Sequence, residues 1–148
     1  MRAIWLLGAM AGCAYRAGSF SASGHEFAGQ RATLGCLDLA IDRRPDAPLG
    51  AVLAYDLGNR CDHAIRIDLS AAAVVGRTSI GDTRLAPYDP LRELHPMALD
   101  GRAVGRETIE YRSEEPIAAR DVCVDAGGLI AAAPYWQCFV TAPEERVP

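Results

Sequence analysis

The sequence predicts an all-β protein, built as a single antiparallel β-sandwich of about seven or eight short strands. Three observations predict this class. Apolar and polar residues alternate with the two-residue period of a β-strand in several segments. Pro, Gly and Asn interrupt the alternation roughly every 10–15 residues, as turns do between strands. An even set of cysteines in the predicted domain suits a disulfide-bonded fold.

The predicted domain covers residues 31–142, and its strands follow from the alternation. LGCLDLAID is the clearest case, because Leu37, Leu39 and Ile41 share one face while Asp38 and Asp42 share the other. Similar patterns, with shorter or more continuous apolar runs, predict the remaining strands. The predicted strand segments are residues 34–42, 51–57, 64–70, 71–77, 83–88, 106–112, 119–126 and 135–140.

Turn sequences separate these segments. GNRCDH, with Gly58-Asn59 as its strongest signal, predicts a turn over residues 58–63. The longest interruption, 87–105, is rich in Pro and Gly, and long loops in compact domains are often functional. We therefore predict a contact loop there, with the alternative that the loop simply caps the core. Its larger side chains are Tyr88, Leu91, Leu94, His95 and Met97.

The first twelve residues have the order of a signal peptide: Arg2, a short apolar run and small residues at the exit. The run is too short to span a bilayer, which needs about 20 apolar residues. Met10-Ala11-Gly12-Cys13 resembles the lipobox of bacterial envelope lipoproteins, whose usual form is Leu-Ala/Ser-Gly/Ala-Cys. The resemblance implies that Cys13 is lipidated and anchors the mature protein in a membrane, facing the periplasm or the exterior.

Two alternatives stay open for this segment. Ordinary cleavage after Ala11 gives a secreted soluble protein, and a buried N-terminal strand or helix gives no leader at all. Residues 13–30, rich in Ala, Gly and Ser without a period, predict a flexible tether. Residues 143–148 are a predicted tail. Residues 51–70, AVLAYDLGNRCDHAIRIDLS, are similar to adjacent strands of immunoglobulin-like bacterial domains, which implies an immunoglobulin-like sandwich.

If Cys13 belongs to the anchor, four cysteines remain, and export permits two disulfides. We favour Cys123–Cys138, because the intervening sequence reads as strand, turn and strand and places the two residues nearly opposite each other. This leaves Cys36–Cys61, while a Cys36–Cys138 bridge is an open alternative. No pair has the CxxC spacing of structural zinc sites, and we expect neither a metal nor a cofactor.

Charge and motifs argue against several function classes. All 15 basic residues are arginines, dispersed among 19 acidic residues without a basic patch, which argues against a nucleic-acid partner. His25-Glu26 lacks the second histidine of a zinc-protease helix, and no Gly-x-Ser-x-Gly motif occurs. Asp56, Asn59 and Asp62 could offer oxygens to calcium, but an Asx-rich turn is the commoner meaning of such a cluster.

The resulting hypothesis is a non-catalytic exported lipoprotein that acts as a binding or assembly module in the bacterial cell envelope. Its expected partners are the membrane, through the lipid anchor, and an envelope protein. The alternative is a small secreted hydrolase acting on glycan or cell wall. That enzyme would have to bring His63 or His95 together with acidic residues from several strands.

Overall fold

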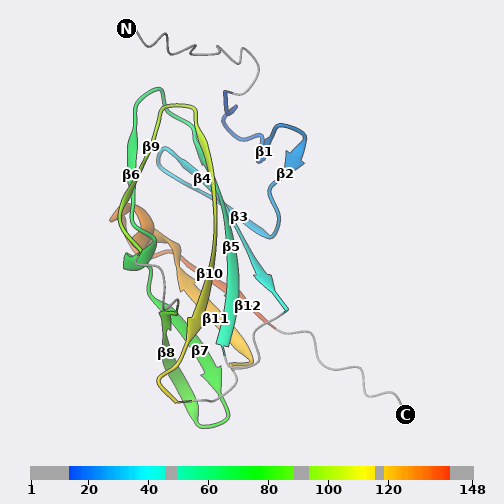
Figure 1. Ribbon diagram of the computed structural model, residues 1–148, viewed down its shortest axis with the longest axis vertical. Coiled ribbons are helices and arrows are strands. Elements are labelled where there is room, and N and C mark those ends of the chain that lie inside the picture. The colour runs from blue at the N-terminus through cyan, green and yellow to red at the C-terminus, as the bar shows by residue number, and fades with distance from the viewer. Residues whose placement is uncertain (1–13, 46–49, 89–93, 116–118, 141–148) are drawn as a thin grey trace, which may run out of the picture.

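The computed structural model describes residues 14–45, 50–88, 94–115 and 119–140 (Figure 1). Strands and two short 3₁₀ turns make up the regular structure of these ranges, which confirms the all-β prediction. No helix in them is long and apolar enough to cross a membrane. The elements are β1 (Ser21–Ala22), β2 (His25–Glu26), β3 (Gln30–Leu34), β4 (Leu37–Arg44), β5 (Gly50–Asn59), β6 (Ile65–Ile67), η1 (Leu69–Ala71), β7 (Val74–Thr78), β8 (Gly81–Pro87), β9 (Met97–Leu99), β10 (Val104–Arg112), β11 (Asp121–Asp125), η2 (Ala126–Ile130) and β12 (Trp136–Phe139).

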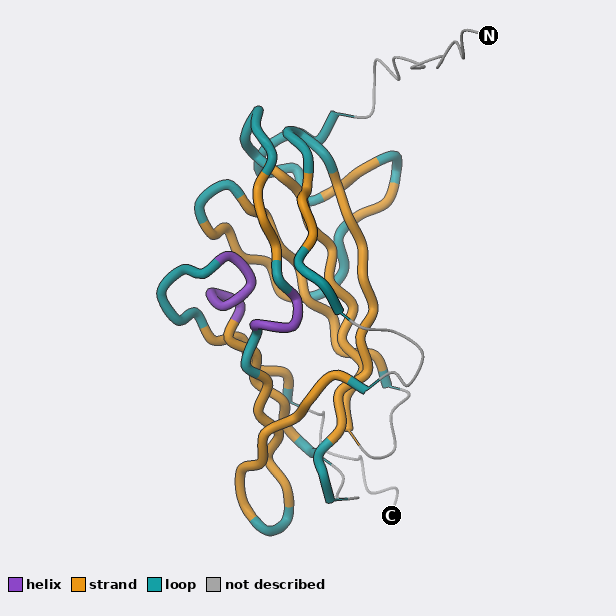
Figure 2. The backbone as a smooth tube through the Cα atoms, turned by 60° about the vertical axis from the view of Figure 1, so that its left-hand side comes forward, coloured by secondary structure: helices purple, strands orange, loops and turns teal. Residues whose placement is uncertain are grey.

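Eight strands form one antiparallel sheet in the order β12-β11-β7-β8-β10-β5-β4-β3, which is nearly closed into a barrel (Figure 2). Long pairings build two four-stranded halves, β3-β4-β5-β10 and β8-β7-β11-β12. A short pairing joins the halves, with Tyr111 opposite Pro87 and Arg112 opposite Ala86. Strands β6 and β9 form a small sheet of their own, as do β1 and β2.

Side chains bridge the seam where β3 and β12 end the sheet. The Gln30 Nε2 amide on β3 donates to the Cys138 carbonyl on β12 at 2.7 Å. Arg43 on β4 donates to the carbonyls of Ala119 and Phe139 at 2.9 and 3.4 Å and also to that of Arg120. Unpaired strand edges invite pairing with other chains. Here the Gln30 side chain occupies the Cys138 carbonyl on the edge strand β12, which a further strand would otherwise use.

The strand predictions hold best where alternation is clearest. Leu37, Leu39 and Ile41 on β4 are buried, as are Tyr55 and Leu57 on β5. The predicted turn over 58–63 begins later than expected, because β5 runs on to Asn59. The predicted loop before residue 105 contains β9, which pairs with β6 through Ile67 and Met97. The immunoglobulin-like sandwich remains a prediction.

Asn59 explains the shifted turn. Its side-chain amide lies 2.8 Å from the His63 carbonyl and 3.0 Å from those of Leu99 and Asp100, and its Oδ1 accepts from the Cys61 amide at 2.9 Å. With these partners the buried Asn59 side chain satisfies backbone groups of the loop that follows β5. The hydrogen bonds of the Asn59 side chain therefore hold the β5–β6 loop against β9.

The predicted flexible tether is wrong for residues 14–30. Tyr15 is 3% exposed and Phe27 is buried, and their rings stack at 5.7 Å over Ala40 of the sheet. Gly58 on β5 makes room for this contact, because a Cβ there would lie 2.4 Å from a ring carbon of Tyr15. The aromatic residues supply apolar contacts that the small-residue composition of the segment conceals. Cys13, the predicted leader 1–12 and the predicted tail 143–148 lie outside the described residues.

Two tyrosines share a hydrogen bond inside the core. The hydroxyls of Tyr55 on β5 and Tyr111 on β10 lie 2.6 Å apart, and both side chains are fully buried. Burial raises the pKa of Tyr55 well above its usual value and that of Tyr111 from 10.0 to about 12. The unfolded chain thus ionises first. The contribution of the two neutral hydroxyls to the free energy of unfolding is therefore complete below pH 10 and is lost as the pH rises toward 12.

We expect Tyr55→Phe and Tyr111→Phe each to lower the free energy of unfolding by about 1–2 kcal/mol, because each leaves a buried hydroxyl without its partner. The double variant should lose less than the sum, since no unpaired hydroxyl then remains. Urea denaturation measures the three changes. Tyr88→Phe, an exposed position, is the control and should change stability by less than about 0.5 kcal/mol. Strictly additive losses would show that the two hydroxyls do not interact.

Candidate functional site

A fully buried carboxylate lies on the outer side of β4. Asp38 accepts hydrogen bonds from the Tyr15 hydroxyl at 2.6 Å, the Gly18 amide at 2.7 Å and the Thr33 hydroxyl at 2.6 Å. Arg60 Nε lies 3.4 Å from the same carboxylate. Burial, followed by the bond to Asp38, raises the pKa of Tyr15 to about 12. Alternation places Asp38 on the face opposite Leu37 and Leu39, and the segment after residue 14 buries it there.

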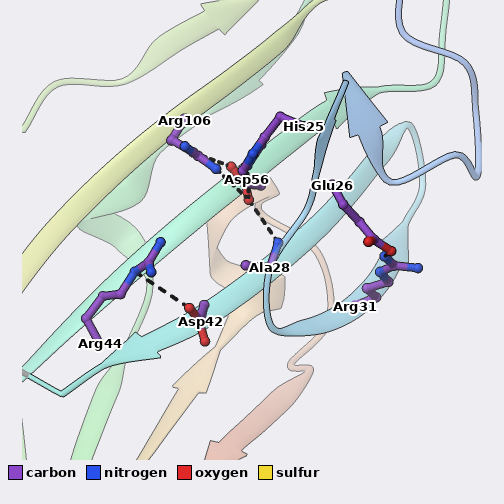
Figure 3. Close-up of polar contacts among 8 residues, drawn as sticks. All are labelled: His25, Glu26, Ala28, Arg31, Asp42, Arg44, Asp56 and Arg106. Carbon is purple, nitrogen blue, oxygen red and sulfur yellow. Dashed lines mark hydrogen bonds and ion pairs between the residues drawn. The ribbon is translucent and has the colours of Figure 1, made fainter. Parts of the chain in front are cut away.

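A second buried carboxylate, that of Asp56 on β5, lies beneath the β1–β2 hairpin (Figure 3). Arg106 faces it directly across the β5–β10 pair and contacts its two oxygens at 2.7 and 3.4 Å. The Ala28 amide donates to Asp56 at 3.2 Å, and His25 Nε2 lies 3.7 Å away. Two contacts from one guanidinium fix the orientation of the carboxylate.

This constellation can hold the N-terminal segment in place. An Asp–His pair is also part of many hydrolytic sites, where the carboxylate orients the imidazole. Here Asp56 is engaged by Arg106 and by a backbone amide, and His25 is half exposed on a two-residue strand. Neighbouring pairs, Arg31–Glu26 at 2.8 Å and Arg44–Asp42 at 3.6 Å, lie at the surface and add little stability (Figure 3).

Both favoured disulfides are present, and the Cys36–Cys138 alternative is wrong. Cys123 and Cys138 are direct partners in the β11–β12 pair, as the strand–turn–strand pattern predicts. The other bridge, Cys36–Cys61, joins the β3–β4 turn to the loop after β5. His63 lies near this bridge, with ligand atoms within 4.8 Å of both sulfurs. Because the sulfurs are bonded to each other, they are not available as thiolate ligands.

The remaining predicted ligands and acids have separate partners. Asp56 pairs with Arg106, while the Asn59 oxygen accepts from a backbone amide and Asp62 is exposed. The oxygens considered for calcium thus have separate roles. His63, proposed for the hydrolase alternative, contacts the neighbouring Asp62 at 3.4 Å with both side chains largely exposed.

The described side chains of the predicted contact loop fall into two groups, one packed on the core and one exposed. Leu94 and Met97 pack against the core, as the capping alternative expects. Tyr88 is exposed, with the Arg112 guanidinium 3.6 Å from its ring centre. His95 is exposed as well. Leu91 lies outside the described residues. A contact role for Tyr88 and His95 stays a prediction.

Strand β12 carries an apolar surface that the sequence pattern does not reveal. Phe139 and Gln137 point inward, so Trp136, Cys138 and the following Val140 point outward. A hollow of about 180 Å³ lies on this face. YWQCFV is nearly continuous in apolar residues and therefore reads as a strand buried on both faces. The hollow is lined by Val75, Arg77, Asp82, Asp121, Cys123, Cys138 and Val140.

Comparison with known proteins adds information about the fold only. Neither a protein-family model nor a curated protein matches the sequence. Among solved structures, the chain is similar to the yjhA protein from Bacillus subtilis, a structural genomics target. The TM-score is 0.51 at 7% identity, over 77% of this chain and 97% of that one. At this identity the likeness concerns the arrangement of strands.

We expect Asp38→Asn to lower the free energy of unfolding by about 2 kcal/mol, because an amide cannot accept all the bonds that the carboxylate accepts. The N-terminal segment should then detach, and trypsin should cleave after Arg16 faster than in the parent protein. Asp42→Asn is the matched control, because Asp42 lies on the same strand in a surface pair with Arg44. Equal cleavage rates in the two variants would show that Asp38 does not hold the segment.

Proposed function

We propose that this protein is a non-catalytic exported lipoprotein that serves as a binding or assembly module in the bacterial cell envelope. Two disulfides support an oxidising compartment outside the cytoplasm. The Met10-Ala11-Gly12-Cys13 sequence supports a lipid anchor. The binding role is carried by one observation, the exposed apolar surface of β12. We also propose that the two halves of the sheet correspond to the two sheets of an immunoglobulin-like sandwich, joined here by the short β8–β10 pairing.

The β12 surface has the chemistry of a protein contact site. Trp136 is 50% exposed, Val140 is 73% exposed and the neighbouring Tyr135 is 43% exposed. Aromatic residues contribute most of the binding energy in many interfaces, and apolar patches with a charged border often mark such interfaces. Arg77, Asp82 and Asp121 supply charged groups beside the hollow.

The Cys123–Cys138 bridge supports the same proposal. It crosses the two strands that carry the exposed residues, and it lies on the outward face itself. A cross-linked strand pair keeps its side chains in a fixed arrangement, which lowers the entropy lost on binding. An envelope protein with a complementary apolar patch is the partner that this surface fits.

The intact mass of the membrane-extracted protein tests the anchor. We expect a chain that begins at Cys13, carries a diacylglyceryl group and gains two hydrogens for each disulfide upon reduction. Cys13→Ser is the control and should abolish the lipid mass and the membrane association. A chain that begins at Gly12, or an unprocessed chain with free thiols, would contradict the lipoprotein assignment.

In-cell photo-crosslinking tests the binding surface. A photoreactive side chain at position 136 should give a single discrete adduct with an envelope protein, because Trp136 lies within the proposed interface. The matched control is position 80, where Ile80 is 74% exposed on the β7–β8 turn. Val140→Asp should weaken the adduct at position 136 about tenfold by placing a charge in the interface. Equal adducts at positions 136 and 80 would remove the β12 surface as the binding site.

A further inference from the structure

We propose that the end of the domain carrying the Cys36–Cys61 bridge lies against the bilayer, and that a very short connection to the lipid holds it there. This inference rests on the proposed lipidation of Cys13. It adds an orientation to that proposal: one end of the domain meets the membrane, and the opposite end points away from it.

The length of free chain sets the distance. Tyr15 is buried, its amide donates to the Arg102 carbonyl at 2.7 Å, and its hydroxyl donates to Asp38 at 2.6 Å. Cys13 precedes Tyr15 by two residues, so their Cα atoms lie at most about 7 Å apart. A flexible tether over residues 13–30 would have allowed about 60 Å. The folded N-terminal segment thus removes nearly all the freedom that such a tether would provide.

The contacts of Tyr15 identify the end that faces the lipid. The Arg102 backbone amide donates to the Cys61 carbonyl at 2.9 Å, and the Asn59 backbone amide donates to the Ala103 carbonyl at 2.9 Å. The attachment point therefore lies on the β5–β6 and β9–β10 loops. Figures 1 and 2 show these loops at the end from which the N-terminal segment starts, with the β7–β8 hairpin at the opposite end.

The charges at this end show what kind of contact to expect. Arg16 and Arg102 are exposed there, and so are Asp62 and Asp100. Positive and negative groups are nearly balanced, so attraction to anionic lipid contributes little. Two acyl chains give a stable anchor without help from basic residues. The lipid supplies the affinity and the fold supplies the orientation.

Fluorescence quenching on vesicles tests the orientation. With four cysteines in bridges, Cys13 remains for coupling the 12–148 chain to a maleimide lipid in phosphatidylcholine vesicles. A fluorophore is attached through an azide-bearing residue at position 62 or 80, both of which are exposed. Headgroup spin-labelled lipids should quench the fluorophore at position 62 at least threefold more than that at position 80, at low and high salt alike.

A variant with fifteen Gly and Ser residues inserted between Ala14 and Tyr15 is the control for the length of chain between the lipid and the folded domain. The insertion should bring the quenching ratio close to one. Similar quenching at positions 62 and 80 in the parent chain would overturn the inference, and so would a ratio that survives the insertion. Coupling is chemical, so this result does not depend on lipidation in cells. If the cellular chain carries no lipid, the proposed function and this inference fail together, whereas equal quenching of a lipidated protein removes the inference alone.

Discussion

The buried carboxylate of Asp38 is the interaction on which the outer layer of this protein depends. A charge with no access to water is stable only when donors surround it. Here the donors come from Tyr15, Gly18 and Thr33, and Arg60 approaches from the loop that holds Cys61. The N-terminal segment, β3 and the disulfide-bonded loop therefore meet at a single side chain. Asp56 repeats the arrangement one strand away, where it contacts His25 of the β1–β2 hairpin, the Ala28 amide and Arg106 of β10.

The outer faces at the two ends of the sheet are covered to different extents, and this difference leaves the apolar surface of β12 exposed. On the β4–β5 side, the N-terminal segment covers the outer face and buries Ala40. On the β11–β12 side, the seam is bridged by Gln30 and Arg43, which donate to the backbone carbonyls of Cys138, Phe139 and Ala119. Nothing among the described residues covers the outward side of Trp136 to the same extent. The edge of the sheet at β12 is thus bridged by side chains, whereas the outward face of β12 stays exposed to solvent.

The sequence predicts most strands because their two-residue period is a local property. Burial of Leu37, Leu39 and Ile41 follows directly from alternation, and the Cys123–Cys138 bridge follows from a hairpin of neighbouring strands. The docking of Tyr15 could not be read in the same way. It depends on Asp38 and on a glycine in β5, which lie more than twenty residues away and show no pattern with it.

The candidate surface was missed for a related reason. An apolar run such as YWQCFV fits a strand buried on both faces as well as a strand with one exposed apolar face. Gln137 gives no help, because a polar residue suggests the outward side and yet Gln137 is buried. Only the partners of β12 in the sheet decide which residues point to solvent. Leu94 and Met97 illustrate the converse, since loop residues chosen as contacts instead pack on the core.

The close approach of Tyr15 to Gly58 also has an evolutionary consequence. The ring lies directly on the backbone of β5, so a side chain at position 58 and an aromatic ring at position 15 exclude each other. The two positions therefore constrain each other sterically, although they lie 43 residues apart in the numbering. Among relatives of this protein, loss of the glycine should accompany loss of the aromatic residue after the cysteine. Such covariation would mark which relatives keep the folded N-terminal segment and which have a true tether.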